Sequence, residues 1–301
     1  MKALITGAGG FLGQHLVKFL KKKDCEIYNL GYKPVKNCFH FPLSNLSDRI
    51  TIKKTVAKIK PDYLFHLAGS ANTSSDIVEC FSVNTFFAEY LLDAINYANL
   101  QHHTKIVIVG TAAEYGPINE DQLPISESML PKPETLYGIS KLAQTNLASS
   151  WQDLKNLLVI IRPFNIIGSN MPKHLALGSF FEQINSITDK GVLRTGNLNT
   201  ERDFIDAVDV VHIMWKLVNN PKAYGEIINL CTGVPVSMKV IVDYLIKHSK
   251  RTIKLETERN RIKENDIKLH YGDNSKLKRL IGEYEFISWR KTISGVIDFY
   301  E

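Results

Sequence analysis

The segment TGAGGFLG, residues 6–13, constrains the fold more than any other part of this 301-residue chain. It follows the apolar run KALIT (2–6) directly and opens an amphipathic stretch, with a glycine at every third position. A tight turn, close backbone approach to a pyrophosphate, and close packing of a helix on a strand all require such glycines. The anion then lies at the helix N-terminus, where N–H groups are free. We therefore expect dinucleotide contacts at Gly7, Gly10, Phe11, Leu12 and Gly13.

Short apolar runs alternate with amphipathic stretches along most of the chain. The runs mostly lack polar alternation, which indicates strands that are buried on both faces of a parallel sheet. Strands are expected at 2–6, 25–30, 63–69, 105–111, 157–165 and 226–233, and helices near 11–23, 48–59, 83–98, 135–151, 207–219 and 236–249. Repeated strand–helix alternation predicts an α/β fold with a Rossmann-type doubly wound parallel sheet.

The alternation breaks down in the C-terminal half, where helices and shorter strands follow after most of the sheet is complete. We expect residues 1–165 to form a dinucleotide-binding domain that is completed by about 205–235. Residues 166–204 and 236–301 are expected to form a smaller substrate-binding lobe over the carboxyl edge of the sheet. Ligands of open α/β folds bind at that edge.

Composition excludes several classes of protein. No apolar run approaches the roughly 18 residues of a membrane helix, and the N-terminus lacks the regions of a secretion signal. Four scattered cysteines without a Cys-x-x-Cys pair indicate reduced thiols in a cytoplasmic protein. The net charge of +6 suits an anionic ligand. A clustered basic face for nucleic acid is not evident, and the adjacent His102 and His103 do not predict a metal site.

The segment YGISK places Tyr137 and Lys141 four residues apart, on one face of a helix. A phenol has a pKa of about 10 in water, too high for easy proton exchange at neutral pH. A nearby ammonium and an oxidised nicotinamide favour the phenolate and are expected to lower that pKa. Tyr137 then becomes a usable general acid or base, and Lys141 can also bind the nicotinamide ribose.

The end of the second strand bears on the choice of cofactor. Folds that select NAD usually place an acid there for the ribose hydroxyls. Here the strand ends in NLGYKP, without a carboxylate and with Lys33 close by. Lys33 can attract a 2′-phosphate, which favours NADPH slightly over NADH, or tolerance of both.

The glycine spacing, the Tyr-x-x-x-Lys pair and the hydroxyl of Thr111 at a strand end together resemble the extended short-chain dehydrogenase/reductases, the nucleotide-sugar epimerase/dehydratase family. The resemblance covers essentially the whole chain and implies more cofactor contacts. HLAG (66–69) resembles the segment beside the nicotinamide, and Asn45-Leu46 stands where a related Asp-Leu pair contacts adenine. VNTFF resembles the family's Val-Asn-x-x-Gly-Thr, with its glycine replaced. The implied cofactor residues are Leu67, Ala68, Gly69, Asn45, Leu46 and Asn84.

The segment GTAAEYG (110–116) bears on the type of reaction. In the family, the hydroxyl at Thr111 bonds the sugar's C4 oxygen, and 4,6-dehydratases carry an acid pair, or a polar residue and Glu, next to it. Ala112 and Ala113 occupy those substrate-side positions and can transfer no proton. Glu114 is adjacent, but neighbouring side chains at a strand end point in different directions. We therefore expect carbonyl reduction or 4-epimerisation by Thr111, Tyr137 and Lys141, and not dehydration.

Four later segments resemble the GDP-4-keto-6-deoxymannose reductases within this family: RPFNIIG (162–168), GNLNTERDFIDAVDVV (196–211), GEIINLCTG (225–233) and YGDNSKLKRLIG (271–282). The resemblance implies that Asn165 binds the substrate near its phosphates. It also implies that Arg202 pairs with the diphosphate, which suits a planar guanidinium.

RNRIKEND (259–266) aligns with the family's Arg-x-Arg-Pro-x-Asp segment near the nucleotide, which implies substrate contacts by Arg261, Lys263 and Asp266. Lys263 replaces an Arg and Glu264 a Pro, so dTDP-, UDP- or CDP-linked sugars remain alternatives to GDP-linked ones.

The favoured hypothesis is an NADPH- or NADH-dependent 4-reductase of a nucleotide-diphospho-4-keto-6-deoxyhexose. One alternative is a 4-epimerase with tightly bound NAD, and another is a non-catalytic dinucleotide sensor. The resemblance also implies a homodimer formed through helices 83–98 and 135–151. No metal, nucleic acid or membrane partner is expected.

Overall fold

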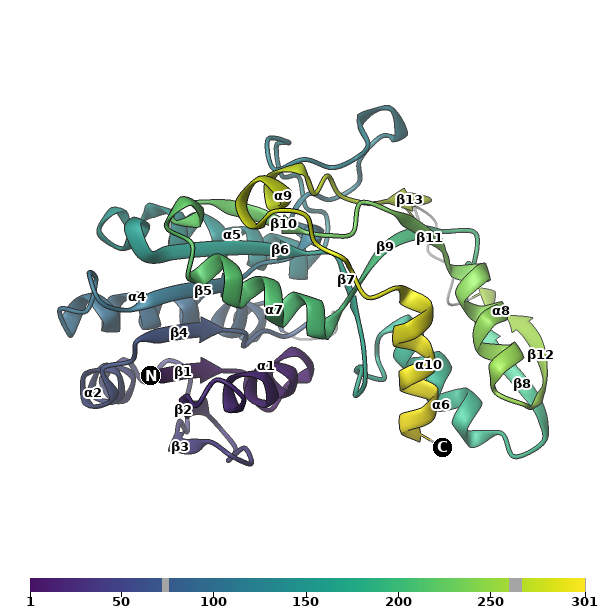
Figure 1. The fold of residues 1–301 in the computed structure, drawn as a ribbon, viewed down its shortest axis with the longest axis horizontal. Helices are drawn as coiled ribbons and strands as arrows, with labels where there is room; N and C mark the ends of the chain where they lie inside the picture. The colour runs from purple at the N-terminus through teal and green to yellow at the C-terminus, as the bar shows by residue number, and fades with distance from the viewer. Residues whose placement is uncertain (72–75, 260–266, 301) are drawn as a thin grey trace.

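A computed structural model describes residues 1–71, 76–259 and 267–300, and it has one large sheet between two layers of helices (Figure 1). The strands run in the order β10-β6-β5-β4-β1-β2-β3, and every neighbouring pair is parallel. Their bounds are Lys2–Thr6 (β1), Glu26–Gly31 (β2), Phe39–Pro42 (β3), Tyr63–His66 (β4), Lys105–Val109 (β5), Leu158–Pro163 (β6) and Ile227–Leu230 (β10). The predicted Rossmann-type doubly wound sheet is confirmed.

Successive residues of the central strands enter two different cores, which explains why the apolar runs lack alternation. Ala3 and Ile5 pack in a cluster with α1 and α7, whereas Leu4 packs with α2 and α4 on the other face. The helices on these faces are Phe11–Lys21 (α1), Arg49–Ile59 (α2), Phe87–Tyr97 (α4), Leu136–Ser150 (α5) and Ala207–Val218 (α7). Each begins within a few residues of its predicted start.

Two features of this part were not expected from the sequence. Strand β3 lies at the sheet edge beside β2, and its side chains are exposed or half-buried, so it shows no buried apolar run. The helix expected at 83–98 begins earlier, as Ile77–Phe81 (α3), and passes through a π-helical turn at Ser82–Phe86 (η1) before α4. Such π-turns often occur at functional sites.

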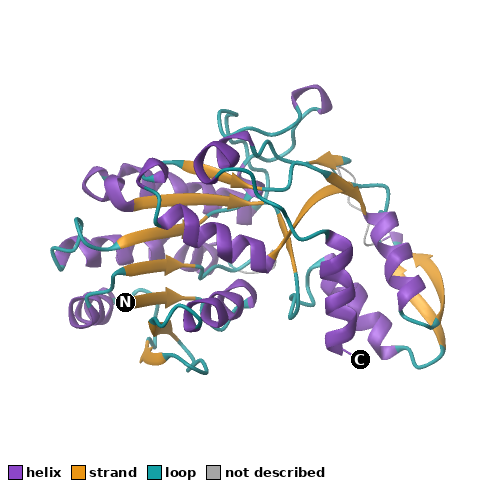
Figure 2. Cartoon of the chain, viewed as in Figure 1, coloured by secondary structure: helices purple, strands orange, loops and turns teal. Residues whose placement is uncertain are grey.

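A smaller group of elements lies beyond the carboxyl ends of the large sheet (Figures 1 and 2). Its helices pack their own apolar cluster, which includes Phe180, Leu193 and Ile241. The elements are Asn165–Ile167 (β7), Ala176–Ser186 (α6), Lys190–Thr195 (β8), Glu201–Asp206 (β9), Pro235–Ser237 (β11), Met238–His248 (α8), Thr252–Thr257 (β12), Leu269–His270 (β13) and Trp289–Tyr300 (α10). Strand β9 pairs with β7, β11 and β13, and β12 pairs with β8.

Helix α9 (Ser275–Ile281) returns to the large sheet, although the sequence assigned this segment to the smaller lobe. Its residue Leu277 is buried in the cluster formed by α1 and α7. Within the described part of the chain, no helix is long and apolar enough to cross a membrane.

Candidate active site

Several of the predicted site residues follow the carboxyl ends of β1, β4 and β5, which are adjacent in the sheet. Strand order reverses between β1 and β4, because the chain builds β2 and β3 on one side of β1 and β4 and β5 on the other. Open α/β sheets bind ligands at such a switch point. The smaller group of elements lies over the same edge of the sheet (Figure 1).

The glycine loop after β1 touches the loop after β4. Gly7 has a φ of +74°, and a Cβ atom there would lie 2.7 Å from the backbone nitrogen of Ala68. A Cβ atom at Gly13 would lie 2.1 Å from the carbonyl oxygen of Gly7. Side chains at these two positions would clash with backbone atoms, so the predicted cofactor loop requires glycine there. Gly7, Gly13, Leu67 and Ala68 are thus brought together, whereas Gly69, the next residue, faces Asn84 and Lys141.

The start of α1 suits a pyrophosphate. Gly10 is the N-cap, its N–H bonds the carbonyl of Gly7 at 2.9 Å, and no side chain in the described ranges caps the helix. The first-turn N–H groups, those of Phe11, Leu12 and Gly13, have no partner within an α-helix. Together with the helix dipole they favour a bound anion. This geometry fits a dinucleotide cofactor.

The residues predicted near adenosine lie at the ends of β2 and β3. Lys33 is exposed. Its loop contacts the glycine loop, because a Cβ atom added at Gly9 would lie 3.4 Å from the Val35 side chain. Asn45 is exposed, and its Oδ1 accepts the N–H of Ser47 at 2.8 Å. Leu46, by contrast, is buried in the core. The structure thus leaves Lys33 and Asn45 accessible to a ligand.

Asn84, also predicted as a cofactor residue, is fully buried in the π-helical turn η1. Its Oδ1 accepts the N–H of Ser70 at 2.7 Å, and its Nδ2 donates to the Ser70 carbonyl at 3.0 Å. The same Nδ2 donates to Ser140 Oγ at 2.9 Å. Asn84 therefore connects the loop after β4 to helix α5, and direct contact with a cofactor stays a prediction.

Thr111 follows β5 and caps a short 3-10 turn, Ala112–Glu114 (η2). Its Oγ1 accepts the N–H of Ala113 at 3.2 Å, and Glu114 Oε1 accepts the N–H of Thr111 at 2.9 Å. This reciprocal pattern is a capping box. It explains why the strand ends in Gly-Thr, because a Cβ atom at Gly110 would lie 2.4 Å from Glu114 Oε1.

Tyr137 and Lys141 lie on α5, which packs directly against this turn. A Cβ atom at Gly138 would be 2.6 Å from the carbonyl oxygen of Ala113, so glycine permits the approach. The Lys141 ammonium donates to the carbonyl of Val109, at the end of β5, and to Gln144 Oε1, both at 2.6 Å. The structure thus brings Thr111, Tyr137 and Lys141 together at the end of one strand.

The pKa of Tyr137 differs from the expectation. Burial raises it to about 12, and the hydroxyl of Thr111 opposes this shift. Burial also lowers the pKa of Lys141 to about 8. The ammonium donates to Val109 and Gln144, and burial outweighs any effect that it has on the phenol. An oxidised nicotinamide near Tyr137 would favour the phenolate and oppose the effect of burial.

The two alanines and Glu114 present no acid to a substrate. Ala112 is 4% exposed and packs in an apolar cluster with Tyr115, Ile125, Phe164 and Cys231. Glu114 is fully buried, and its Oε2 accepts a hydrogen bond from Nε–H of Arg162 at 2.8 Å. Burial raises the pKa of the Glu114 carboxyl, while the Arg162 charge and the N–H of Thr111 oppose the shift.

The predicted substrate residues Asn165 and Arg202 lie on the paired strands β7 and β9. Asn165 Nδ2 donates to the carbonyl of Asp203 at 3.0 Å, and Arg202 Nη1 donates to the carbonyl of Glu201 at 2.9 Å. The other three, Arg261, Lys263 and Asp266, lie outside the described residues.

Sequence reasoning missed Arg162 as the partner of Glu114, and Gln144 as the partner of Lys141. The spacing Thr-x-x-Glu at Thr111–Glu114 was an available signal for the capping box. No comparable signal marks Arg162 or Gln144, because their partners are set by the packing of β6 and α5 on β5.

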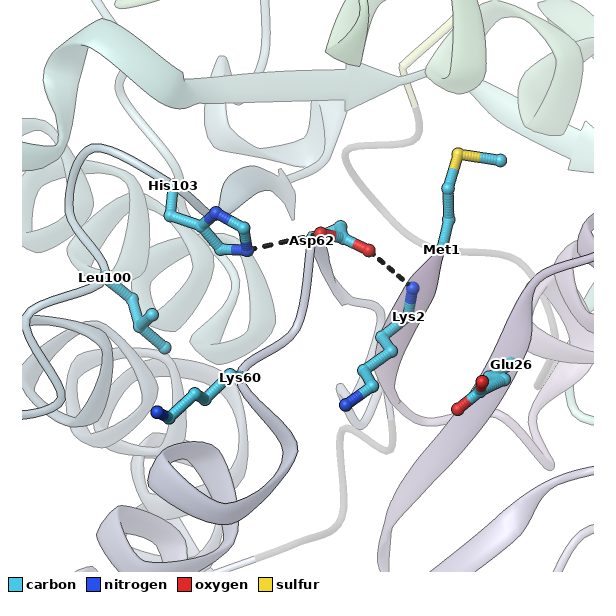
Figure 3. A pocket seen from close by; sticks show the side chains of 7 residues that line it. All are labelled: Met1, Lys2, Glu26, Lys60, Asp62, Leu100 and His103. Atoms are coloured by element: carbon cyan, nitrogen blue, oxygen red, sulfur yellow. Dashed lines mark hydrogen bonds and ion pairs between the residues drawn. The ribbon is translucent and has the colours of Figure 1, made fainter.

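A hollow of about 470 Å³ lies at the amino-terminal end of β1, away from these residues (Figure 3). Its Asp62 accepts the backbone N–H of Lys2 at 2.7 Å and faces His103 Nε2 at 3.2 Å. These polar groups bond one another, and nothing marks a ligand there. Within residues 1–71, 76–259 and 267–300, no group of three His, Cys, Asp or Glu side chains could bind a metal.

Known proteins are similar to this chain in sequence and in fold. A model described as the NAD dependent epimerase/dehydratase family matches residues 3–231. GDP-6-deoxy-D-talose 4-dehydrogenase of Aggregatibacter actinomycetemcomitans is 28% identical over 96% of this chain and 95% of its own. GDP-6-deoxy-D-mannose reductase of Pseudomonas aeruginosa is 23% identical over 100% of this chain and 97% of its own.

Two solved structures have the same fold. RMD from Pseudomonas aeruginosa in complex with NADPH has a TM-score of 0.84 at 20% identity, with 99% of this chain and 98% of that chain covered. UDP-glucose 4-epimerase of Thermus thermophilus in complex with NAD has a TM-score of 0.85 at 20% identity, with 100% and 99% covered.

Proposed function

The chain belongs to the NAD dependent epimerase/dehydratase family, and we propose that it is an NAD(P)H-dependent 4-reductase of a nucleotide-diphospho-4-keto-6-deoxyhexose. One observation carries the proposal. Thr111, Tyr137 and Lys141 meet at the end of β5, while Ala112 is packed into an apolar cluster and Glu114 is paired with Arg162. A proton donor is thus present without the acid and base that removal of water would require.

The roles of the residues follow from their placement. A dinucleotide bound there would supply the hydride for C4 of the sugar. Tyr137 donates a proton to the C4 oxygen, and the Thr111 hydroxyl polarises that oxygen. Lys141, bonded to the end of β5, favours the charged state of the tyrosine when it has given up its proton. The glycine loop and the first turn of α1 bind the pyrophosphate.

A GDP-linked substrate is the specific form of this proposal. Two curated relatives are named for GDP-6-deoxyhexoses, and each match spans at least 95% of both chains. Asn165 and Arg202 are proposed to bind the substrate near its diphosphate, and Arg261, Lys263 and Asp266 to bind the nucleotide. A homodimer through α4 and α5, and a cytoplasmic location, are part of the same proposal.

The test is incubation with NADPH or NADH and a panel of GDP-, dTDP-, UDP- and CDP-linked 4-keto-6-deoxyhexoses. Oxidation of the cofactor is followed by absorbance, and the product configuration by NMR. Tyr137→Phe should reduce turnover at least about 100-fold, the usual range for a general acid. Tyr28→Phe, which removes a hydroxyl on β2 that donates to Glu26 at 2.7 Å, is the matched control and should leave turnover unchanged. Turnover retained by Tyr137→Phe would contradict the assigned role.

A 4-epimerase with tightly bound NAD is the second candidate. The UDP-glucose 4-epimerase fold covers the whole chain, and Thr111, Tyr137 and Lys141 would suffice for its chemistry. An epimerase returns the hydride to the sugar, so the absorbance of the cofactor shows no net change. A reductase instead consumes one NAD(P)H for each sugar that it reduces.

A further inference from the structure

Glu114 lies beside the proposed site and has no part in the chemistry assigned to Thr111, Tyr137 and Lys141. Its side chain is fully buried, and its two oxygens have different partners. Oε1 accepts a hydrogen bond from the N–H of Thr111 at 2.9 Å, and Oε2 accepts one from Nε–H of Arg162 at 2.8 Å. Burying a carboxylate is unfavourable unless it is paired and hydrogen-bonded. A buried ion pair so close to a reactive hydroxyl therefore points to a role in the site.

The local backbone accommodates this carboxylate. Only glycine at position 110 leaves room for Oε1, since a Cβ atom there would lie 2.4 Å away. The Thr111 oxygen accepts the N–H of Ala113, and its own hydrogen stays available for donation. By bonding the Thr111 N–H, Glu114 fixes the turn from which that hydroxyl reaches Tyr137.

The charge of Glu114 also acts on the two titratable groups of α5. Burial is the largest influence on Tyr137 and raises its pKa, and Glu114 and the Cys80 thiol of α3 act in the same direction. Burial lowers the pKa of Lys141, and Glu114 opposes that shift. From β6, Arg162 faces Glu114 and partly offsets its charge. A negative charge here thus favours the protonated form of both groups.

We propose that Glu114 is a positioning residue that fixes the Thr111 turn and supplies the buried negative charge that keeps Tyr137 a proton donor. This rests on the proposed function, because ketone reduction needs the phenol, whereas alcohol oxidation needs the phenolate. Arg162 keeps the carboxylate ionised and oriented, so the pair biases the site toward reduction.

The test measures the protonation state of Tyr137 without any substrate. The protein is labelled with ¹³Cζ-tyrosine, saturated with oxidised dinucleotide, and titrated by NMR from pH 6 to pH 11. Tyr137→Phe assigns the resonance by its disappearance. Four variants are compared with the wild type: Glu114→Gln, Arg162→Met, the double variant of both, and Glu127→Gln. Glu127 is the matched control, because its carboxylate also accepts a backbone N–H, that of Asn229 at 2.9 Å.

The Tyr137 midpoints of the variants are expected to differ in the size of their shift. Glu114→Gln leaves the Arg162 charge unopposed, so the Tyr137 midpoint should fall by about one pH unit or more. In Arg162→Met the buried Glu114 carboxyl loses the partner that keeps it ionised and takes up a proton, so the Tyr137 midpoint should match that of the double variant. The Tyr137 midpoint should fall less in the double variant than in Glu114→Gln. It should not change in Glu127→Gln. If a single variant fails to fold, the double variant still decides, because it leaves neither charge unpaired.

A purely structural role for Glu114 would lower stability and leave the Tyr137 midpoint unchanged, which would refute the proposal. Equal shifts in Glu114→Gln and Glu127→Gln would do the same. With a substrate in hand, kcat for reduction in Glu114→Gln should decline at a lower pH than in the wild type, with KM unchanged. Turnover that survives Tyr137→Phe would instead refute the proposed function, while the midpoints would still report on Glu114.

Discussion

Gly13→Ala tests the cofactor loop, because the outcome expected from packing opposes the outcome expected from helix propensity. Alanine in place of glycine within a helix is normally stabilising by about 1 kcal/mol. At Gly13, however, the added Cβ atom would lie 2.1 Å from the Gly7 carbonyl oxygen, and real Cβ contacts are not shorter than 3.0 Å. The contact is with backbone, so no rotamer relieves it and α1 must move away from β1.

Overpacking of this kind costs about 1–3 kcal/mol, and the rigid backbone contact places it at the upper end. Subtracting the helix gain of about 1 kcal/mol leaves a net loss near 2 kcal/mol. The first-turn N–H groups move with α1, so we expect at least about tenfold weaker dinucleotide binding, a change of about 1.4 kcal/mol. Urea unfolding measures the first effect, and fluorescence titration with NADPH and NADH measures the second.

Gly295→Ala is the matched control, because Gly295 also lies within a helix, α10, and nothing is within 4 Å of its added Cβ atom. It should stabilise the protein by about 0.5–1 kcal/mol without changing cofactor affinity. The reasoning fails if Gly13→Ala is as stable as the wild type and binds the dinucleotide equally well. It also fails if both substitutions change stability in the same direction.

Two further predictions concern buried charge. Lys141 has a pKa lowered from 10.5 to about 8, so between these values the unfolded chain binds more protons and stability rises with pH. The free energy of unfolding of the wild type, relative to that of Lys141→Met, should therefore increase by up to about 3 kcal/mol from pH 7 to pH 10.5. Urea unfolding at several pH values measures this difference, and a difference that does not change with pH contradicts the prediction. Ala112→Asp places an unpaired carboxylate in an apolar cluster and should lose about 3–5 kcal/mol, without gaining dehydratase activity. Ala113→Asp, at a half-buried position, is its control and should lose less.

Much of the fold was predictable because the signals are local. The runs KALIT and KIVIV have consecutive apolar residues, which point to opposite faces of the strand. This pattern is typical of a strand that helices cover on both sides. Strand β3 was missed for the converse reason. It lies at the sheet edge, where half-exposed residues such as Phe41 need no apolar run. The π-helical turn at Ser82–Phe86 was missed because a period of 3.6 residues does not reveal it.

The site was predictable as a set of residue types but not as an arrangement. The spacing of Tyr137 and Lys141 follows from the helix, and both lie on α5 as expected. The pKa of Tyr137 did not follow from that spacing, because burial, which the sequence does not encode locally, exceeds the effect of the neighbouring ammonium. The partners of Asn84, Lys141 and Glu114 likewise depend on which elements pack together.

The amino-acid sequence by itself determined the alternation of the central buried strands with helices, the glycine turn and the absence of acids at Ala112 and Ala113. These depend on backbone conformation and on residue type within a few positions of the chain. Only the tertiary structure decided where each polar group is bonded. Arg162 is 48 residues from Glu114, and the two meet only because β5 and β6 are adjacent in the sheet. The energy of a buried charge depends on such a partner, and so the properties of the site are set by packing.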